Sequence, residues 1–519
     1  MSQKHHHRLK TVSLVILITL MGKVLGLVRN MLLGQTFGTG FEADALLAAS
    51  HLPRWLFDAV FASAVSASFI PVFTETLEHE GREEADRLAG SFFTIVGLTA
   101  ALLTALGMVF APQLVGLMTN FTAAQTAALA TRLLTTIFPS LFFTGVAFSM
   151  VGVLNALGQF KMPAAMSIAS NGILIVYFFF FVQRFGVYGA AVAMLLGWIA
   201  QAVMQMPSLR KHGFRYRPSL RHPGLKKIGK LMLPVMISTW ILPINMAVSI
   251  RFASSISGGT AGLTLANDLY IMIAGIFVLS VTNVLFPEMS RLSATGDKTA
   301  FRDMVRDTMQ TLLFLLIPMT VGLMLMATPL VQLLYQYQEF DVASTALTSS
   351  ALAFISLGMV GYGIQNVLVR AFYAEKRGRV PLVAGVISIG VNAVLCWLLV
   401  GSMGVAGLAL ASAVSLLTSA LILVPAAHRM FGGGLVTGRL ILSLGKMAAA
   451  AFCMAVVVFV TRELLQGFMA EGNVLMRIVL VGVPALIGAM VYFGLAHLFR
   501  LREVRSFLQT IKTRRKGDT

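Results

Sequence analysis

Long runs of apolar residues, separated by short polar segments, extend along almost the whole chain. A helix needs roughly 20 apolar residues to cross the hydrocarbon core of a bilayer. Several runs are longer than this, so we expect the corresponding helices to tilt or to project beyond the bilayer. The pattern therefore predicts an all-α polytopic membrane protein with fourteen membrane-spanning helices, over residues 11–35, 42–74, 88–117, 124–156, 162–183, 187–208, 227–254, 261–289, 304–334, 344–372, 380–400, 404–428, 438–462 and 474–499.

The Lys and Arg residues are concentrated on one side of this pattern. With a cytoplasmic N-terminus, 31 of the 40 fall in cytoplasmic segments or the adjoining helix ends, and the external loops with their adjoining helix ends hold only Arg184, Arg462 and Arg477. Cytoplasmic loops of membrane proteins carry such an excess. We therefore predict that both termini are cytoplasmic. The basic run LRKHGFRYRPSLRHPGLKKIGK (209–230) is then a membrane-facing connector rather than a nucleic-acid site.

The chain also repeats itself at a nearly constant offset. NALGQFKMPAAMSI (155–168) aligns with YAEKRGRVPLVAGV (373–386), and GVYGAAVA (186–193) aligns with GVAGLALA (404–411), both 218 positions apart. SFIPVFTETL (68–77) matches VLFPEMSRLS (284–293) at an offset of 216. Six helices in each repeat give the halves one orientation, as in transporters whose substrate site lies between parallel repeats near the midplane.

This repeat predicts the domain organisation. Two six-helix repeats surround a central cavity, and the last two helices lie outside the repeat. We expect a first repeat over 1–222, a second over 223–432, two extra helices over 433–500 and a basic cytoplasmic tail over 501–519.

Composition agrees with a membrane protein. The chain is 57% hydrophobic and 12% charged, with a mean hydropathy of +0.83, whereas soluble proteins carry roughly 25% charged residues. Cys396 and Cys453 lie in apolar runs, so we expect them to be small core residues without thiol or redox chemistry. No GxxxxGK[ST] motif indicates ATP hydrolysis, and we expect no cofactor and no metal site. The short external loops leave no room for a catalytic domain, so a membrane glycan polymerase or ligase is disfavoured.

Charged residues within the predicted spans are the candidate functional residues, because each costs at least ~2.5–3.5 kcal/mol at bilayer depth. Lys23 and Arg29 both lie on the first helix, about 120° and ~9 Å apart. Gly22 and Gly26 form a small-xxx-small pair that allows a neighbouring helix to approach closely. Either both cations border a wide cavity, or Lys23 snorkels to the cytoplasmic headgroups.

Further candidates lie on the second, seventh and eighth helices. Arg54 follows a proline and is followed four residues later by Asp58, so the two either neutralise each other or contact substrate. Asp44 lies near the outer end of its helix, where it supports the cavity or the helix start. Arg251 either binds substrate or anchors the outer end of the seventh helix, with Asp268 as a possible partner. Asn245 lies on the same helix as Arg251, and this helix also holds two prolines.

Cations equal or outnumber carboxylates along these helices, which favours an anionic substrate. Phosphate is the group that Arg and Lys recognise best. Without a nucleotide-binding motif, transport is expected to use an ion gradient, the membrane potential or the substrate gradient. Carboxylates at positions 44, 58 and 268 leave a cation-coupled drug exporter open as an alternative.

Several sequence blocks resemble the MurJ (MviN) family of lipid II flippases, in the multidrug/oligosaccharidyl-lipid/polysaccharide exporter superfamily. GKVLGLVRNMLLGQTFGTGFEADALLAASHLPRWLF is similar to the family's opening block, and SASFIPVF to its AFIPVF segment. GVLNALGQFKMPA is similar to NALGxFxxPA, and VLVRAFYAEKRGRVPLV to RAFYAxKDTxTP. The resemblance covers most of the first twelve helices.

The resemblance implies a flippase that moves lipid II, the undecaprenyl-pyrophosphate-linked peptidoglycan precursor, by alternating access for cell-wall synthesis. It implies that Lys23, Arg29 and Arg251 grip the pyrophosphate, that Asp44 is the aspartate of the ADA motif, and that the last two helices hold the polyprenyl tail. It places the protein in the bacterial cytoplasmic membrane, as a monomer that can work with the peptidoglycan-synthesis machinery.

The chain departs from the family at four places. Asn30 replaces an aspartate, Phe57 and Asp58 replace a basic pair, Ala62 and Ser63 replace Glu-Gly, and Asp268 replaces a basic residue. At least two expected cations are therefore absent or inverted in sign. A flippase for another polyprenyl-pyrophosphate-linked glycan stays open as an alternative.

Overall fold

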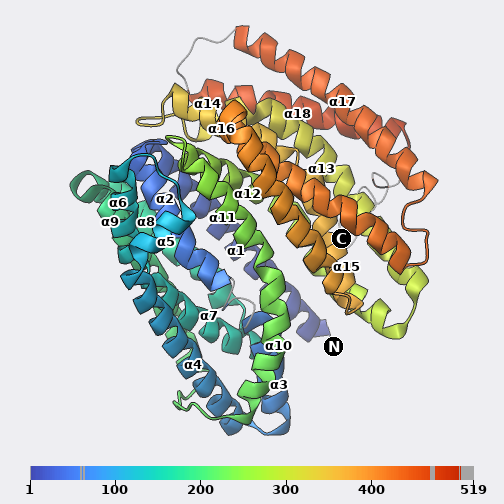
Figure 1. Ribbon diagram of the computed structural model, residues 1–519. Coiled ribbons are helices and arrows are strands. Elements are labelled where there is room, and N and C mark those ends of the chain that lie inside the picture. The colour runs from blue at the N-terminus through green and yellow to red at the C-terminus, as the bar shows by residue number, and fades with distance from the viewer. Residues whose placement is uncertain (1, 59–60, 62–64, 468–473, 502, 504–519) are drawn as a thin grey trace. The chain divides into compact units, whose positions relative to one another are not determined.

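A computed structural model describes residues 2–58, 61, 65–467, 474–501 and 503 of the chain (Figure 1). Within these residues every regular element is a helix, which confirms the all-α prediction. The predicted basic tail over 501–519 lies almost entirely outside the described residues. By packing, the chain divides into two units, Met1–Ala261 with Gln338–Phe340, and Gly262–Tyr337 with Asp341–Thr519.

The first unit contains the helices of the first predicted repeat and of the seventh predicted span. They are α1 (Ser2–Phe37), α2 (Phe41–Phe57), the π-helix η2 (Val65–Phe69), α3 (Ile70–His79), α4 (Arg82–Val109), α5 (Ala111–Met118), α6 (Ala124–Ile137), α7 (Ser140–Ala156), α8 (Lys161–Phe180), α9 (Val182–Lys211), α10 (Pro223–Thr239) and α11 (Ile241–Ala253). Packing thus places α10 and α11 with the first unit, and the repeat boundary at 222/223 stays a prediction.

Several predicted spans of this unit consist of two helices. Proline marks three of these breaks, because it lacks the N–H that a helix interior needs but is tolerated in the first turn. Pro71 lies in the first turn of α3, Pro112 in the first turn of α5, and Pro139 is the N-cap of α7. The predicted spans 42–74, 88–117 and 124–156 therefore pass from one helix to the next near these prolines, and at Pro71 the π-helix η2 runs directly into α3.

The second unit contains the remaining helices: α12, which begins in the first unit (Gly259–Thr295), α13 (Lys298–Leu334), α14 (Val342–Ser356), α15 (Met359–Ala374), α16 (Arg379–Met430), α17 (Gly438–Gly467) and α18 (Val474–Leu498). Helices α14 and α15 form one predicted span that is bent by 47°. The two predicted spans 380–400 and 404–428 follow one another within α16, separated by a break at Gly404.

The breaks within α9 and α16 fall at equivalent positions of the repeat. Gly186 has φ 51° and ψ −146°, and Gly404 has φ 58° and ψ −135°. Glycine adopts positive φ without the steric cost that a Cβ imposes. Two matching left-handed glycines, 218 positions apart, support the internal repeat read from the sequence.

The last two helices pack against α13 in the second unit. Their shared core includes Phe314, Met454 and Tyr492. The buried Tyr492 hydroxyl donates a hydrogen bond of 2.8 Å to the carbonyl oxygen of Phe314. Lys446 donates to the carbonyl oxygen of Phe499, just beyond the end of α18. The two extra helices are thus a folded part of this unit.

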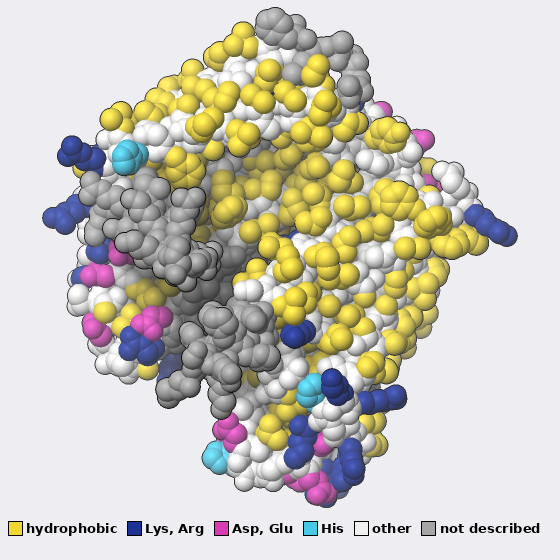
Figure 2. All heavy atoms as spheres, turned by 180° about the vertical axis from the view of Figure 1, so that it is seen from behind, with side chains coloured by type: hydrophobic (Ala, Val, Ile, Leu, Met, Phe, Trp, Pro, Cys, Tyr) yellow, Lys and Arg dark blue, Asp and Glu magenta, His cyan; other side chains and the backbone are white. Residues whose placement is uncertain are grey.

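Among the described residues, ten helices are long and apolar enough to cross a membrane, or eleven if α14 and α15 count as one span. Among the described residues, each predicted span coincides with one or more helices or with a part of α16, so the predicted count of fourteen is compatible with this finding. In Figure 2, apolar side chains cover broad areas of the surface.

Candidate functional site

Arg29, the stronger of the two charged candidates on α1, is held by two amides. Its Nε and Nη2 donate to Oδ1 of Asn30 at 3.1 and 2.7 Å, and its Nη1 donates to Oδ1 of Asn171 on α8 at 3.1 Å. Asn171 in turn donates to the carbonyl oxygen of Gly22 at 3.0 Å. Because arginine stays protonated in proteins, these neutral amides orient the guanidinium without cancelling its charge.

Close packing of α1 against α8 makes this arrangement possible. A Cβ atom at Gly22 would collide with the Ser167 side chain, and one at Gly26 would lie 3.3 Å from Nδ2 of Asn171. The small-xxx-small pair therefore does bring a neighbouring helix close, and that helix is α8. Asn171 completes the charged site, and the sequence reasoning missed it. An Asn in the middle of an apolar run was the signal available.

Lys23, one turn and a half earlier on α1, is half-buried. Its ammonium group makes no hydrogen bond or ion pair with any described residue. A flexible, strongly hydrated ammonium in this position can turn toward a cavity or toward headgroups. Both sequence interpretations of Lys23 therefore stay open.

Asp44 on α2 lies at the start of α12. Its side chain is 3% exposed, and its two carboxylate oxygens accept backbone hydrogen bonds from Gly258 and Ala261, each at 2.8 Å. The first N–H groups of a helix have no partner within the helix, and they favour negative charge. Asp44 is therefore a cap for α12 supplied from a distant segment, a role that the sequence did not predict, because the helix start expected there was that of its own helix.

The backbone around this cap is tightly packed. Gly258 has φ 74°, and a Cβ there would lie 2.6 Å from the carbonyl oxygen of Thr39. Gly38 also has positive φ, and a Cβ there would collide with the carbonyl oxygen of Glu339. The Glu339 N–H donates to the carbonyl oxygen of Gln35 at 3.1 Å. Three segments that are remote in sequence thus meet at the corner between α1 and α2.

Arg251 on α11 binds the C-terminal end of α5. Its Nη1 donates to the carbonyl oxygens of Gly116 (3.1 Å), Leu117 and Thr119 (3.5 Å). A second hydrogen bond joins the C-terminal ends of α5 and α11, because the Asn120 N–H donates to Oγ of Ser254 at 2.6 Å. The last carbonyls of a helix lack partners and favour cations. The geometry thus supports the anchoring interpretation, while the exposed guanidinium keeps Nε and Nη2 without a hydrogen bond to any described residue.

Arg54 and Asp58 lie at the end of α2. Arg54 is exposed and Asp58 is half-buried, and among the described residues no ion pair of 4 Å or less joins them. Pro53 lies inside α2 without ending it, and π-helical backbone follows at Asp58 and over Val65–Phe69. Such π turns occur often at functional sites. Arg54 therefore projects from α2 just before an irregular stretch.

The remaining two candidates lie on α11 and α12. Asn245 is half-buried on α11, and its carbonyl oxygen accepts a hydrogen bond from Ser249 at 3.3 Å. Asp268 is half-buried on α12 in the second unit. The hydrogen bonds of Arg251 described above go to α5. No group of three or more His, Cys, Asp or Glu side chains that could hold a metal ion occurs among the residues that the structure describes.

The basic connector of the sequence analysis has acidic partners in the first unit, which the sequence reasoning did not identify. Arg217 pairs with Glu83 at 2.5 Å, and His222 lies 3.1 Å from Glu84. Lys227 pairs with Glu75 at 2.5 Å. These carboxylates belong to α3 and α4, on the side of the membrane predicted for the connector.

Comparison with known proteins identifies relatives along nearly the whole chain. The sequence pattern of the family described as "Lipid II flippase MurJ" matches residues 33–480. A protein of Bdellovibrio bacteriovorus named "Probable lipid II flippase MurJ" is 28% identical over 506 residues, which are 96% of this chain and 95% of that protein. A protein of Burkholderia cenocepacia named "Lipid II flippase MurJ" is 25% identical over 419 residues, which are 78% of this chain and 81% of that one.

Solved structures show the same fold. "Lipid II flippase MurJ, inward closed conformation" matches with a TM-score of 0.79 at 24% identity, over 94% of this chain and 98% of that one. An inward-facing multidrug resistance MATE family transporter of the MOP superfamily matches with a TM-score of 0.66 at 17% identity, over 81% and 98%. The all-helical architecture is thus shared with both kinds of transporter.

Proposed function

Because this chain belongs to the lipid II flippase MurJ family, we propose that it moves lipid II across the bacterial cytoplasmic membrane for cell-wall synthesis. The observation that carries the proposal is the family match over residues 33–480. In this proposal the chain is a multi-pass transporter with both termini in the cytoplasm.

Arg29 is the proposed ligand for the pyrophosphate. Amide partners from α1 and α8 fix the plane of its guanidinium, and a planar guanidinium is suited to bidentate binding of phosphate oxygens. Lys23 and Arg54 are proposed as additional cations, because neither is paired with a carboxylate among the described residues. Arg251 contributes through the remaining donors of its exposed side chain.

The geometry of Asp44 supports this function over cation-coupled drug export. An exporter of that kind needs carboxylates that take up and release a cation. Both oxygens of Asp44 are engaged by backbone N–H groups at the start of α12, so this carboxylate already serves the fold. A flippase for another polyprenyl-pyrophosphate-linked glycan is the second candidate, favoured by the replacement of expected family residues at Asn30 and Asp268.

The test is complementation in cells depleted of their own lipid II flippase. The wild-type chain is expected to restore growth and to make lipid II accessible at the outer surface. Arg29→Ala is expected to abolish both, while Arg291→Ala, which removes an exposed cation paired with Glu288, is the matched control. Failure of a well-expressed wild-type chain would exclude lipid II as the substrate, and full activity of Arg29→Ala would exclude the proposed ligand.

A further inference from the structure

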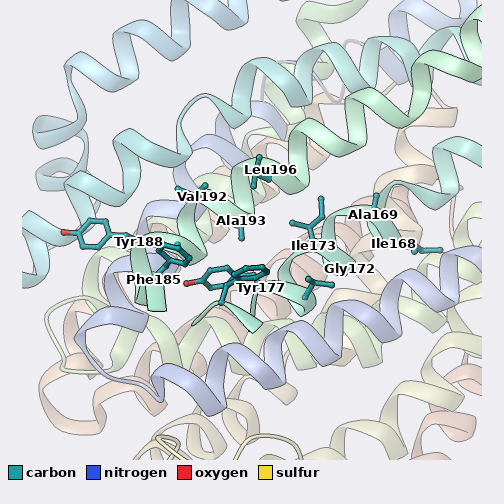
Figure 3. Close-up of a pocket in the computed structure, with 13 residues that line it drawn as sticks. Ile168, Ala169, Gly172, Ile173, Tyr177, Phe185, Tyr188, Val192, Ala193 and Leu196 are labelled. Atoms are coloured by element: carbon teal, nitrogen blue, oxygen red, sulfur yellow. The ribbon is translucent and has the colours of Figure 1, made fainter. Parts of the chain in front are cut away.

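An apolar groove of about 790 Å³ lies between α8 and α9 in the first unit (Figure 3). Aromatic side chains, including Tyr177, Phe185 and Tyr188, line one end, and small residues such as Gly172 and Ala193 line the middle. Both helices are long and apolar enough to span a membrane. The groove therefore opens where lipid is the solvent.

The turn between the two helices builds the aromatic end of the groove. Gly186 breaks α9 with its positive φ, and the Tyr177 hydroxyl donates a hydrogen bond of 2.5 Å to the Gly186 carbonyl oxygen. This bond fixes the Tyr177 ring against the start of α9. A Cβ at Gly172 would meet no atom within 4 Å, so the middle of the groove is open space.

A second, more polar pocket of about 440 Å³ continues from this aromatic end. It shares Phe185 and Tyr188 with the groove and is also lined by Glu42, Gln125 and Arg132. Arg132 is exposed and Glu42 is half-buried. Neither forms an ion pair with any described residue, including the other. The pocket thus presents one positive and one negative group beside the mouth of an apolar groove.

We propose that groove and pocket together bind one molecule of phosphatidylethanolamine. One acyl chain lies in the groove, the phosphate binds Arg132, and the primary ammonium binds Glu42. The charge pattern favours this lipid over others. Phosphatidylglycerol offers no cation to Glu42, and the quaternary ammonium of phosphatidylcholine has no N–H to donate to the carboxylate.

The second half of the repeat provides an internal comparison. At the positions equivalent to Tyr177, Phe185 and Tyr188 it has Leu395, Met403 and Ala406, 218 residues later. The aromatic lining is therefore particular to the first half. Gly390 is the equivalent of Gly172, and a Cβ there also meets no atom within 4 Å. Gly390→Leu is thus a matched control for Gly172→Leu.

The test measures lipids retained by the purified full-length protein. The protein in detergent is mixed with equal amounts of phosphatidylethanolamine, phosphatidylglycerol and phosphatidylcholine that carry the same acyl chains, and bound lipids are counted by native mass spectrometry. The wild type is expected to retain phosphatidylethanolamine at least about fivefold over phosphatidylcholine. Gly172→Leu is expected to lose this bound lipid, whereas Gly390→Leu retains it.

Two charge variants test the headgroup assignment without filling the groove. Glu42→Gln is expected to bring retention of phosphatidylethanolamine down to that of phosphatidylcholine, and Arg132→Gln to lower the retention of both. Equal retention of the three lipids, a preference for phosphatidylglycerol, or wild-type retention by Gly172→Leu and Glu42→Gln would overturn the proposal. So would displacement of the bound lipid by an equal amount of undecaprenyl phosphate. The measurement needs no flipping, so its outcome is separate from that of the proposed function.

Discussion

Asn171 on α8 accepts a hydrogen bond of 3.1 Å from Arg29 on α1, and the same amide donates to Gly22, two turns earlier on α1. One buried side chain thus both orients the cation and ties the two helices together. The position of the guanidinium depends on α8 as much as on α1.

Asn171→Leu is expected to slow lipid II flipping by about tenfold or more. Loss of a buried hydrogen-bonding partner costs about 1–3 kcal/mol, and 1.4 kcal/mol corresponds to tenfold. Ser170→Ala, at the neighbouring position, is the control. The measurement is the rate at which lipid II becomes accessible outside, at matched protein level. Equal rates for the two variants would show that Arg29 needs no support from α8.

Asp44→Asn is expected to lower the thermal unfolding temperature. The amide group must turn one N–H donor toward a backbone N–H at the start of α12, so one of the two capping hydrogen bonds is lost. Loss of such a bond in a buried site costs about 1–3 kcal/mol. Glu78→Gln, an exposed carboxylate on α3, is expected to change nothing. An unchanged unfolding temperature for Asp44→Asn would contradict the capping role.

The role of Arg251, as a cap of α5 or as a substrate ligand, can be determined by comparing the unfolding temperature and the flipping rate of its variants. If it mainly caps α5, Arg251→Ala lowers the unfolding temperature slightly, since a cation at an exposed helix end contributes about 0.3–1 kcal/mol. Arg251→Lys keeps the charge near the carbonyls and is expected to recover most of both stability and flipping. A loss of flipping in both variants at unchanged stability would instead identify Arg251 as a substrate ligand.

The Glu75–Lys227 pair gives a pH dependence with a defined sign. The hydrogen bond and charge of Lys227 hold the pKa of the Glu75 carboxyl below its ordinary value of 4.5. A carboxyl with a lowered pKa in the folded state contributes stability above its unfolded pKa and loses it as pH falls through the folded value. The difference in unfolding temperature between wild type and Glu75→Gln should therefore be present at pH 6 and vanish below the folded pKa.

High salt is expected to shrink the same difference, because both side chains are about half exposed and screened by solvent. Lys227→Met serves as the reciprocal variant. A difference that persists at low pH would show that Glu75 acts through something other than its charge.

Gly186→Ala is expected to destabilise the protein by about 1–3 kcal/mol, because residues with a Cβ rarely adopt φ 51° with ψ −146°. A Cβ there meets no atom within 4 Å, so the effect comes from the backbone alone. Gly172→Ala, with equal space but helical backbone, is expected to stabilise by about 0.5–1 kcal/mol. Thermal unfolding of the two variants measures the difference, and equal shifts would rule out strain at Gly186.

The sequence was sufficient to predict the helices, since the length and apolar character of a run determine whether it can span a membrane. The breaks near Pro71, Pro112 and Pro139 also follow from local chemistry, although we expected continuous spans there. The shared break at Gly186 and Gly404 follows the repeat, which was visible as matched sequence blocks.

The roles of the charged residues were harder to predict, because their partners are remote or belong to the main chain. Asp44 binds the N–H of Gly258, 214 residues away, and Arg251 binds carbonyl oxygens about 135 residues away. Backbone groups have the same chemistry at every residue, so nothing in the sequence marks these particular ones. For Arg29, the sequence identified the cation but not the amide on α8 that holds it.

The positive-φ glycines at 186 and 404 also bear on how the two predicted halves evolved. A rare backbone conformation at matching positions is what the predicted repeat requires if one duplicated segment already turned at this glycine. The ring of Tyr177, which bonds to that turn, has only Leu395 as its counterpart. The turn is thus common to both predicted halves, and the aromatic groove beside it distinguishes one from the other, as expected for a function the halves do not share.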